Sequence, residues 1–196
     1  MKILIYYFIV LSFCISISAN GQLLPFRNFG VKDGLTNTNV KAMIRDDRGL
    51  LWIGTDFSIN WFDGKRFYKP EIKTNIGQLL ILNFYEDLQH DIWALTFFNG
   101  LYKFHDGEFT NYLIDTISKD AVTNTISGMV QVEKNKYIVI GIGVVYWFDG
   151  NRYTLFDSTN VQLVTNANNV VILPDETILL STENGIFEYK YNSLCD

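Results

Sequence analysis

The tripeptide Phe62-Asp63-Gly64 returns as His105-Asp106-Gly107 and again as Phe148-Asp149-Gly150, each copy 43 residues after the last. One more step of 43 residues reaches Tyr191-Asn192-Ser193, which we interpret as a degraded fourth copy. A fixed period of this size is typical of chains built from stacked copies of one supersecondary unit. Asp-Gly between apolar runs favours a hairpin turn, because glycine adopts the positive φ that such turns require.

The sequence around each Asp-Gly turn repeats as well. Every unit has an apolar run, a polar turn, a second run such as Trp52 to Thr55 or Trp93 to Thr96, and a third run that ends at the Asp-Gly position. An aromatic fourth run follows the first three of these turns. The runs are rich in Val, Ile, Phe, Tyr and Trp and are too short for helices, which predicts four short strands per unit. Four antiparallel strands in about 42 residues are the blade of a β-propeller.

We place the blades at about 40–70, 78–112, 126–157 and 169–191. The residues that carry the repeat signature are Trp52, Thr55, Asp63, Gly64, Trp93, Thr96, Asp106, Gly107, Asp149, Gly150 and Thr182. The predicted fold class is therefore all-β, with no helix of useful length after the first residues of the chain.

The first unit resembles a known family. The stretches Asp33 to Val40, Ile44 to Gly49, Leu51 to Thr55 and Phe62 to Gly64 are similar to the two-component regulator propeller repeat. This resemblance extends over residues 24–191 and is strongest in the first copy. It implies that the blades belong to the extracytoplasmic sensor region of a hybrid two-component histidine kinase. A full-length relative would be a histidine kinase, and we expect this chain to lack the kinase itself.

The ends of the repeat region bear on whether the ring closes. The fourth unit stops after its third strand, whereas residues 24–29 read like an orphan outer strand before the first unit. An extra outer strand at the start and a missing outer strand at the end would suit a closed four-bladed ring, because the first segment could complete the last blade. The same N-terminal strand would be needed in a larger ring, and the resemblance implies seven blades. We therefore predict an open sector of a larger propeller rather than a closed four-bladed ring.

Residues 1–21 are typical of a signal peptide. Lys2 precedes an apolar run over residues 3–17, and small residues around Ala19 and Gly21 suit cleavage before Gln22. The alternative is an uncleaved anchor, but the run is shorter than the roughly 20 residues that a spanning helix needs. We expect residues 22–196 to be exported to the periplasm or cell envelope of a Gram-negative bacterium. Membrane contact would come only through an uncleaved signal or a full-length parent.

The composition excludes several functions. The formal net charge is −5 and no basic cluster is present, so we expect no nucleic-acid partner. Neither the acidic turns nor the histidines are interpreted as a site. The paired acids Asp46-Asp47 and Glu86-Asp87 are interpreted as turn acids. Histidines His90 and His105 have no ligand at metal-binding spacing, and we interpret them as solvated turn residues. Phosphate-binding loops and nucleophile elbows are absent from the sequence. We therefore predict no metal, no cofactor and no enzymatic activity.

One recurrence of polar residues points to a ligand. Threonine and asparagine precede the innermost strand of three units, where the chain crosses between blades near the mouth of the central channel. The candidate ligand-binding residues are Asn37, Asn39, Asn124, Asn166 and Asn168. Amides gathered there would hydrogen-bond a sugar chain. The alternative is that asparagine and threonine recur only because the turn recurs.

The leading hypothesis is thus an extracytoplasmic ligand-sensing propeller segment, with an oligosaccharide as its ligand. A second hypothesis is a protein-interaction module, either a stand-alone propeller or a remnant that pairs with further propeller blades or with itself through open blade edges. A third is a propeller hydrolase or lyase, because function lies in sites rather than in folds.

Overall fold

The computed structural model describes residues 26–72, 78–114, 121–156 and 167–190. In these residues fifteen strands form four antiparallel sheets, three with four strands and one with three. Within each sheet every strand pairs with its neighbour in the sequence, so each sheet is a simple meander. The prediction of an all-β fold built from propeller blades is confirmed.

We call the sheets blades 1 to 4 in chain order. Blade 1 contains β1 (Val40–Arg45), β2 (Leu51–Thr55), β3 (Ile59–Phe62) and β4 (Phe67–Tyr68). Blade 2 contains β5 (Ile81–Glu86), β6 (Ile92–Thr96), β7 (Leu101–His105) and β8 (Glu108–Tyr112). Blade 3 contains β9 (Ile126–Glu133), β10 (Lys136–Gly141), β11 (Val144–Phe148) and β12 (Tyr153–Leu155). Blade 4 contains β13 (Ala167–Ile172), β14 (Thr177–Thr182) and β15 (Gly185–Lys190). Two short 3₁₀ helices, η1 (Val31–Asp33) and η2 (Ala121–Asn124), precede blades 1 and 3.

The Asp-Gly turns join the third and fourth strands of blades 1 to 3. Gly64, Gly107 and Gly150 have φ values of 93°, 88° and 88°, in the left-handed region that favours glycine. In the first and third turns the Asp63 and Asp149 carboxylates accept hydrogen bonds from the backbone N–H groups two and three residues further on. The glycine therefore supplies the positive φ of the turn, and the aspartate supplies an acceptor for its backbone N–H groups.

Three hydrophobic cores hold successive blades together. Trp52 is fully buried between blades 1 and 2, and its ring packs edge-on against Trp61 and Phe104. Trp93 has the same place between blades 2 and 3, and Ile138 between blades 3 and 4. Burying a large apolar side chain stabilises the fold by about 1.5–3 kcal/mol relative to its exposed state. The repeat therefore places one large apolar residue of each second strand in each junction.

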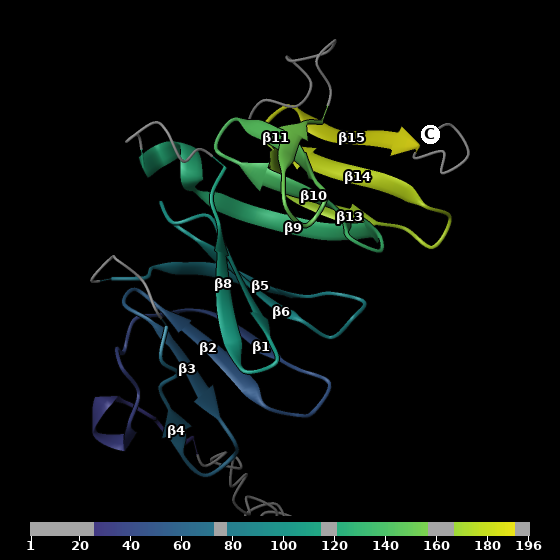
Figure 1. The fold of residues 1–196 in the computed structure, drawn as a ribbon. Helices are drawn as coiled ribbons and strands as arrows, with labels where there is room; N and C mark the ends of the chain where they lie inside the picture. Colours follow the sequence, from purple (N-terminus) through teal and green to yellow (C-terminus); the bar gives the residue numbers. More distant parts are fainter. Residues whose placement is uncertain (1–25, 73–77, 115–120, 157–166, 191–196) are drawn as a thin grey trace, which may run out of the picture.

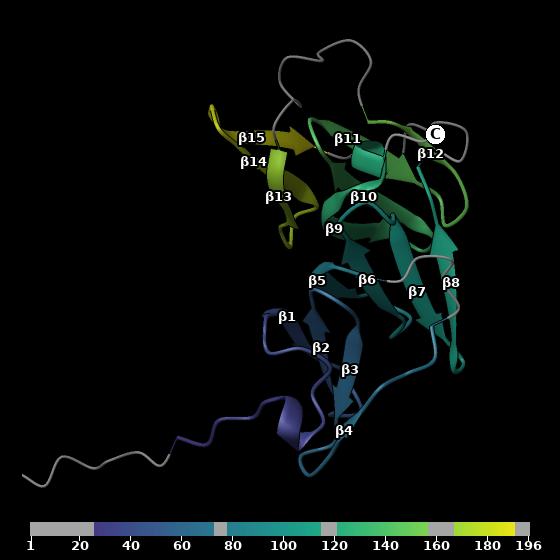
Figure 2. The same ribbon diagram turned by 90° about the vertical axis from the view of Figure 1, so that its left-hand side faces the viewer.

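The blades follow one another in an open arc (Figures 1 and 2). The inner strands β1, β5, β9 and β13 contact one another in that order, and blades 1 and 4 lie at opposite ends of the arc. The prediction of an open sector is therefore confirmed.

The N-terminal strand predicted at 24–29 is not formed in residues 26–29, the part of it that the structure describes. The ring of Phe29 instead packs against Phe62 and Phe67 of blade 1, at centroid distances of 5.3 and 5.5 Å. Leu35 is buried, and the Thr36 N–H donates to Asn60 Oδ1 at 3.1 Å. In a closed four-bladed ring this segment would have paired with β15, but β15 lies at the other end of the open arc.

Residues 29–36 therefore cover part of one face of blade 1, while Met43 of β1 stays 63% exposed on that face. Asn60 points to the side opposite Trp61, because successive side chains of a strand alternate between the two faces of a sheet. Trp61 packs toward blade 2, so the covered face is the one turned away from blade 2. The predicted signal peptide at 1–21 lies outside the described residues.

Candidate functional site

One end of the blades combines the connections between blades with the turns between second and third strands. We call this surface the crossing face; its described parts are residues 36–39, 55–58, 79–80, 96–100, 123–125, 142–143, 168 and 183–184. The Leu79 N–H donates to Phe57 O at 3.1 Å, and the Gly100 N–H donates to Asn124 O at 2.7 Å. These bonds join each turn to the segment that enters the next blade, so the loops form one surface.

The predicted ligand-binding asparagines lie in different environments on this face. Asn39 and Asn168 are exposed, and the Asn39 amide donates to Asp56 Oδ2. Asn37 is half-buried, and its Oδ1 accepts the Asn39 N–H at 2.6 Å. Asn124 is buried, and its Oδ1 accepts the N–H of Ile114 at 2.8 Å. Asn166 lies outside the described residues.

The four described asparagines therefore divide by role. Asn39 and Asn168 present their side chains to solvent, whereas Asn124 holds the backbone of its loop. This role of Asn124 matches the alternative stated in the sequence analysis, in which asparagine recurs because the turn recurs. Ligand binding by the exposed members stays a prediction.

The crossing face also carries exposed apolar side chains that the sequence interpretation missed. Phe57 and Phe98 are 45% and 38% exposed, and Ile142 is 55% exposed at the corresponding turn of blade 3. Phe98 has a φ of 75°, which is rare for a bulky residue, and its N–H donates to Thr125 Oγ1 at 3.1 Å. The signal was present in the repeat, because both phenylalanines follow a signature tryptophan by five residues.

The signature threonines shape these turns from within. Thr55 and Thr96 are fully buried, and their hydroxyls donate to Ser58 O at 3.0 Å and to Gly100 O at 2.8 Å. Each hydroxyl also accepts a backbone N–H of its own turn, which fixes the loop on both sides. Thr182 makes the corresponding bond to Gly185 O at 3.2 Å. The buried Thr55 and Thr96 therefore hold the turns that carry the exposed side chains of the crossing face.

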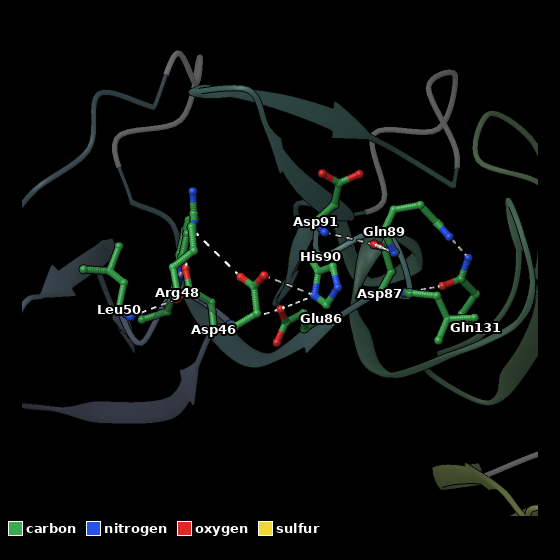
Figure 3. Close-up of polar contacts among 12 residues, drawn as sticks. Asp46, Arg48, Leu50, Glu86, Asp87, Gln89, His90, Asp91 and Gln131 are labelled. Atoms are coloured by element: carbon green, nitrogen blue, oxygen red, sulfur yellow. Dashed lines mark hydrogen bonds and ion pairs between the residues drawn. The ribbon is translucent and has the colours of Figure 1, made fainter.

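The opposite end of the blades carries the turns between first and second strands (Figure 3). Asp46 is buried there, and its Oδ2 accepts the indole N–H of Trp52 at 3.1 Å. Burial raises the pKa of Asp46, but hydrogen bonds from Trp52, Arg48 and the Leu50 N–H outweigh it and hold the pKa below its usual value. The acid therefore stays ionised and serves as a structural acceptor.

Asp87 has the same place in blade 2 and also contacts blade 3. Its Oδ2 accepts the Trp93 indole N–H at 2.8 Å and the Tyr137 hydroxyl of blade 3 at 3.1 Å. Burial and the nearby Asp87 charge raise the pKa of Tyr137, so its proton stays available for this bond. Beside it the Gln131 Oε1 accepts the Leu88 N–H at 2.7 Å (Figure 3). These contacts bridge blades 2 and 3.

Asp47, Glu86 and His90 form a cluster at the junction of blades 1 and 2. His90 Nδ1 lies 3.2 Å from Glu86 Oε1 and 3.5 Å from Asp47 Oδ2, and one ligand atom from each residue lies within 4.8 Å of the others. A hydrogen bond to Glu86 and the charge of Asp47 raise the pKa of His90. A protonated His90 between two carboxylates accounts for the geometry.

The sequence interpretation that His90 has no ligand at metal-binding spacing was wrong, because Glu86 lies four residues before it and contacts its ring. Asp47 belongs to another blade, so spacing along the chain could not reveal that second acid. His105 is paired in the same way, because its Nδ1 lies 2.6 Å from Asp91 Oδ1 and that contact raises its pKa. One histidine and two carboxylates are also a ligand set that divalent metals accept, so the expectation of no metal site stays a prediction.

Comparison with known proteins supports the resemblance found in the first unit. Residues 34–57 match the family described as two component regulator propeller, which confirms that resemblance. No curated protein matches the chain.

The fold is shared with solved propellers. Two structures of the extracellular domain of BT4673 from B. thetaiotaomicron, described as a one component and as a hybrid two component system, align with TM-scores of 0.67 and 0.66 at 19% and 18% identity. They cover 83% and 84% of this chain, and the chain spans 23% of the length of each. The chain therefore resembles part of the extracellular region of such systems.

More distant structures share the fold as well. A virginiamycin B lyase from Staphylococcus aureus aligns at a TM-score of 0.55 and 13% identity, over 82% of this chain and 59% of its own. The WD40 β-propeller domain of Doa1 aligns at 0.55 and 11% identity, over 77% of this chain and 50% of its own. At these identities the likeness shows the fold, and activity must be argued from the site.

Proposed function

We propose that this chain is the ligand-binding segment of an extracytoplasmic sensor propeller and that its crossing face recognises an oligosaccharide. The observation that carries the proposal is the exposure of Phe57 and Phe98 at equivalent turns of adjacent blades, on the same face as the Asn39 amide. Aromatic rings pack against the apolar faces of sugars, and amides hydrogen-bond their hydroxyls. Rigid strands hold both kinds of group in place.

The role we propose is binding without catalysis. The buried acids that contact other functional groups in the described residues already serve the fold. Asp46 and Asp87 hold tryptophans, and Asp91 pairs with Lys103 at 2.8 Å and with His105. A general acid or base needs a free partner position for its substrate, which these carboxylates do not offer.

The extracellular domains among the similar structures favour a place outside the cytoplasm, and we propose the periplasm. In the described residues no helix is long and apolar enough to span a membrane. The signalling output would lie in a kinase that receives the ligand-dependent change from the propeller.

A glycan array probed with residues 22–196 tests the proposal. We expect binding to a subset of oligosaccharides, and we expect Phe57→Ala and Phe98→Ala each to weaken it at least about tenfold, the loss of roughly 1.4 kcal/mol. Asn39→Ala and Asn168→Ala test the amides in the same assay. Phe26→Ala is the matched control, because Phe26 is 94% exposed and lies outside the crossing face.

Three results would contradict the proposal. They are an array without any bound glycan, binding that all four crossing-face variants retain, and binding that Phe26→Ala also abolishes. Turnover of a bound glycan would replace the binding role with an enzymatic one.

A further inference from the structure

Two neighbouring junctions of the arc share one backbone bridge, at the end of the blades opposite the crossing face. Between blades 1 and 2, the Glu86 Oε1 at the end of β5 accepts the Asp47 N–H at 3.2 Å. Between blades 2 and 3, the Gln131 Oε1 of β9 accepts the Leu88 N–H at 2.7 Å. The two acceptors correspond, because each pairs with the residue just before the large buried residue of the second strand. The bridge therefore forms without a charged acceptor.

The junction of blades 1 and 2 nevertheless carries acids at positions that are uncharged in the next junction. Asp47 stands where blade 2 has Leu88, and Glu86 stands where blade 3 has Gln131. His90 Nδ1 lies between the two carboxylates, 3.2 Å from Glu86 Oε1 and 3.5 Å from Asp47 Oδ2 (Figure 3). Because the neutral pair makes the same bridge, the packing of the blades does not explain two acids around one imidazole.

The three ligand atoms have the spacing of a tetrahedral metal centre. Nitrogen and oxygen ligands lie about 2.1 Å from zinc, so two ligands of one ion are roughly 3.4 Å apart. The two distances from His90 Nδ1 lie on either side of that value, and all three atoms lie within 4.8 Å of one another. One imidazole and two carboxylates supply three protein ligands, which leaves the fourth position of the ion to water.

The cluster is open to an ion from solvent, and its charge favours a cation. The side chains of His90, Asp47 and Glu86 are 62%, 42% and 21% exposed. Two carboxylates around a neutral imidazole carry two negative charges, which a divalent cation offsets. Arg48 does not replace such an ion. Its Nη2 pairs with Asp46 at 2.9 Å, and its Nε lies 3.9 Å from Asp47 Oδ1, the oxygen other than the one beside His90.

The second histidine shows that acids beside an imidazole are not sufficient for a site. The side chain of His105 is also 62% exposed, with Nδ1 2.6 Å from Asp91 Oδ1 and Nε2 3.4 Å from Asp106 Oδ2. These acids contact different ring nitrogens, which cannot both bind one ion. Lys103 Nζ also lies 2.8 Å from Asp91 Oδ2 and offsets its charge. Of the two histidines, His90 alone directs a single nitrogen to two carboxylates.

We propose that Asp47, Glu86 and His90 bind a zinc ion that clamps blade 1 to blade 2. Zinc accepts imidazole nitrogen together with carboxylate oxygen, whereas calcium and magnesium take oxygen ligands. Without the ion a proton on His90 lies between the carboxylates, and the metal takes the place of that proton. The site is separate from the crossing face and from its proposed ligand. The expectation of no metal came from spacing along the chain, which does not show that two blades meet here.

Calorimetric titration of zinc chloride into the full, untagged chain tests the site. Cys14 and Cys195 are changed to serine in every sample, because thiolates also bind zinc. We expect one zinc ion per chain, and calcium chloride at the same concentration should not bind. Zinc should also raise the midpoint of urea unfolding, because an ion held by two blades stabilises the folded state. EDTA should return the midpoint to its starting value.

Two conservative variants each remove one ligand and keep the turns. Glu86→Gln retains the bridge, as Gln131 does in the next junction. His90→Asn retains the left-handed turn, because Asn135 has a φ of 59° in the hairpin of blade 3 and His90 has 64°. Each variant should weaken zinc binding at least about tenfold, the smaller loss usual even for outer partners of a metal. Asp47→Asn should do the same, since the ion joins both blades.

His105→Ala is the matched control, because its side chain is as exposed as that of His90 and it should leave zinc affinity unchanged. The proposal fails if zinc does not bind, if calcium binds as tightly, or if Glu86→Gln and His90→Asn retain the parent affinity. An equal loss in His105→Ala also overturns it. Binding that survives Asp47→Asn, or that leaves the urea midpoint unchanged, would show that the ion does not join the blades and overturns the clamp.

Discussion

Asp87 joins three elements through one buried carboxylate. It accepts the Trp93 indole N–H, the Tyr137 hydroxyl and two backbone N–H groups of its own turn. Replacing it with alanine would leave several buried donors without an acceptor, at about 1–3 kcal/mol for each group that stays unpaired. We expect Asp87→Ala to lower the free energy of unfolding by at least about 3 kcal/mol, measured by urea denaturation.

Asp175 provides the control for this substitution. It lies in the corresponding turn of blade 4, is exposed, and accepts the Thr177 N–H at 3.2 Å. Asp175→Ala should cost less than about 1 kcal/mol, as is usual at the surface. Equal losses for the two variants would show that the bridge to Tyr137 has no energetic role.

His90 should titrate above its ordinary pKa of 6.5, because Glu86 accepts a hydrogen bond from it and Asp47 adds a negative charge. A raised pKa in the folded state contributes stability that is complete below pH 6.5 and is lost as the pH rises through the folded value. NMR titration of the imidazole protons measures it. Glu86→Gln should lower the pKa of His90 and leave that of His105 unchanged, since His105 depends on Asp91. An unchanged pKa for His90 would contradict the cluster.

At the scale of elements, the approach of blade 1 to blade 2 depends on Gly54. A Cβ at this position would lie 2.5 Å from Ile81 Cγ2 and 3.1 Å from Phe84 Cε2, both in the next blade. We expect Gly54→Ala to cost about 1–3 kcal/mol of unfolding free energy, because a packed junction must open to accept the methyl group. Thermal or urea unfolding measures the loss.

Gly30 is the matched glycine for that experiment. It also has a negative φ, and its added Cβ would meet Thr38 Cγ2 at an ordinary 3.8 Å. Gly30→Ala should change the unfolding free energy by less than about 0.5 kcal/mol. A cost at Gly30 as large as that at Gly54 would remove the junction as the cause.

The sequence predicts these elements well because a blade is a local structure. Strand pairing and turn type depend on residues fewer than about 15 apart, and the period of 43 residues marks where each pattern restarts. The strand expected at 24–29 is not formed in residues 26–29, because it depended on pairing with a last blade that does not lie beside blade 1 in the open arc. The pairing of His90 with Asp47 was missed for a related reason, since it depends on how two blades meet.

The sequence likewise predicted the location of the candidate site but not the role of each residue in it. The Thr-Asn recurrence located the crossing face, because loops that enter successive blades come to one end of the strands. It did not distinguish the buried Asn124 from the exposed Asn39 and Asn168, because sequence type alone does not tell which amide the backbone will use. Phe57 and Phe98 were passed over, although their equal spacing from Trp52 and Trp93 was visible in the repeat.

At the scale of the whole molecule, stability should follow the number of neighbours that each blade has. In stacked repeats the free energy is close to a sum of terms for the units and for their nearest-neighbour contacts. Blades 2 and 3 are covered on both faces. Blade 1 is covered by blade 2 on one face and in part by residues 29–36 on the other, where Ile53 of β2 is buried. Blade 4 has only blade 3 on one side and bears exposed Ile186 on the other.

Native-state hydrogen exchange should therefore show a gradient along the arc. We compare β2, β6, β10 and β14, because each pairs with a strand on both edges and its amides differ mainly in what covers the sheet. We expect the slowest-exchanging amides of β14 to exchange at least about tenfold faster than those of β6 and β10, a difference of roughly 1.4 kcal/mol in local opening. Strand β2 is the internal control and should resemble β6, because residues 29–36 cover part of its blade. Protection of β14 equal to that of β6 would contradict the exposed face of blade 4, and exchange of β2 as fast as that of β14 would show that residues 29–36 do not stabilise blade 1.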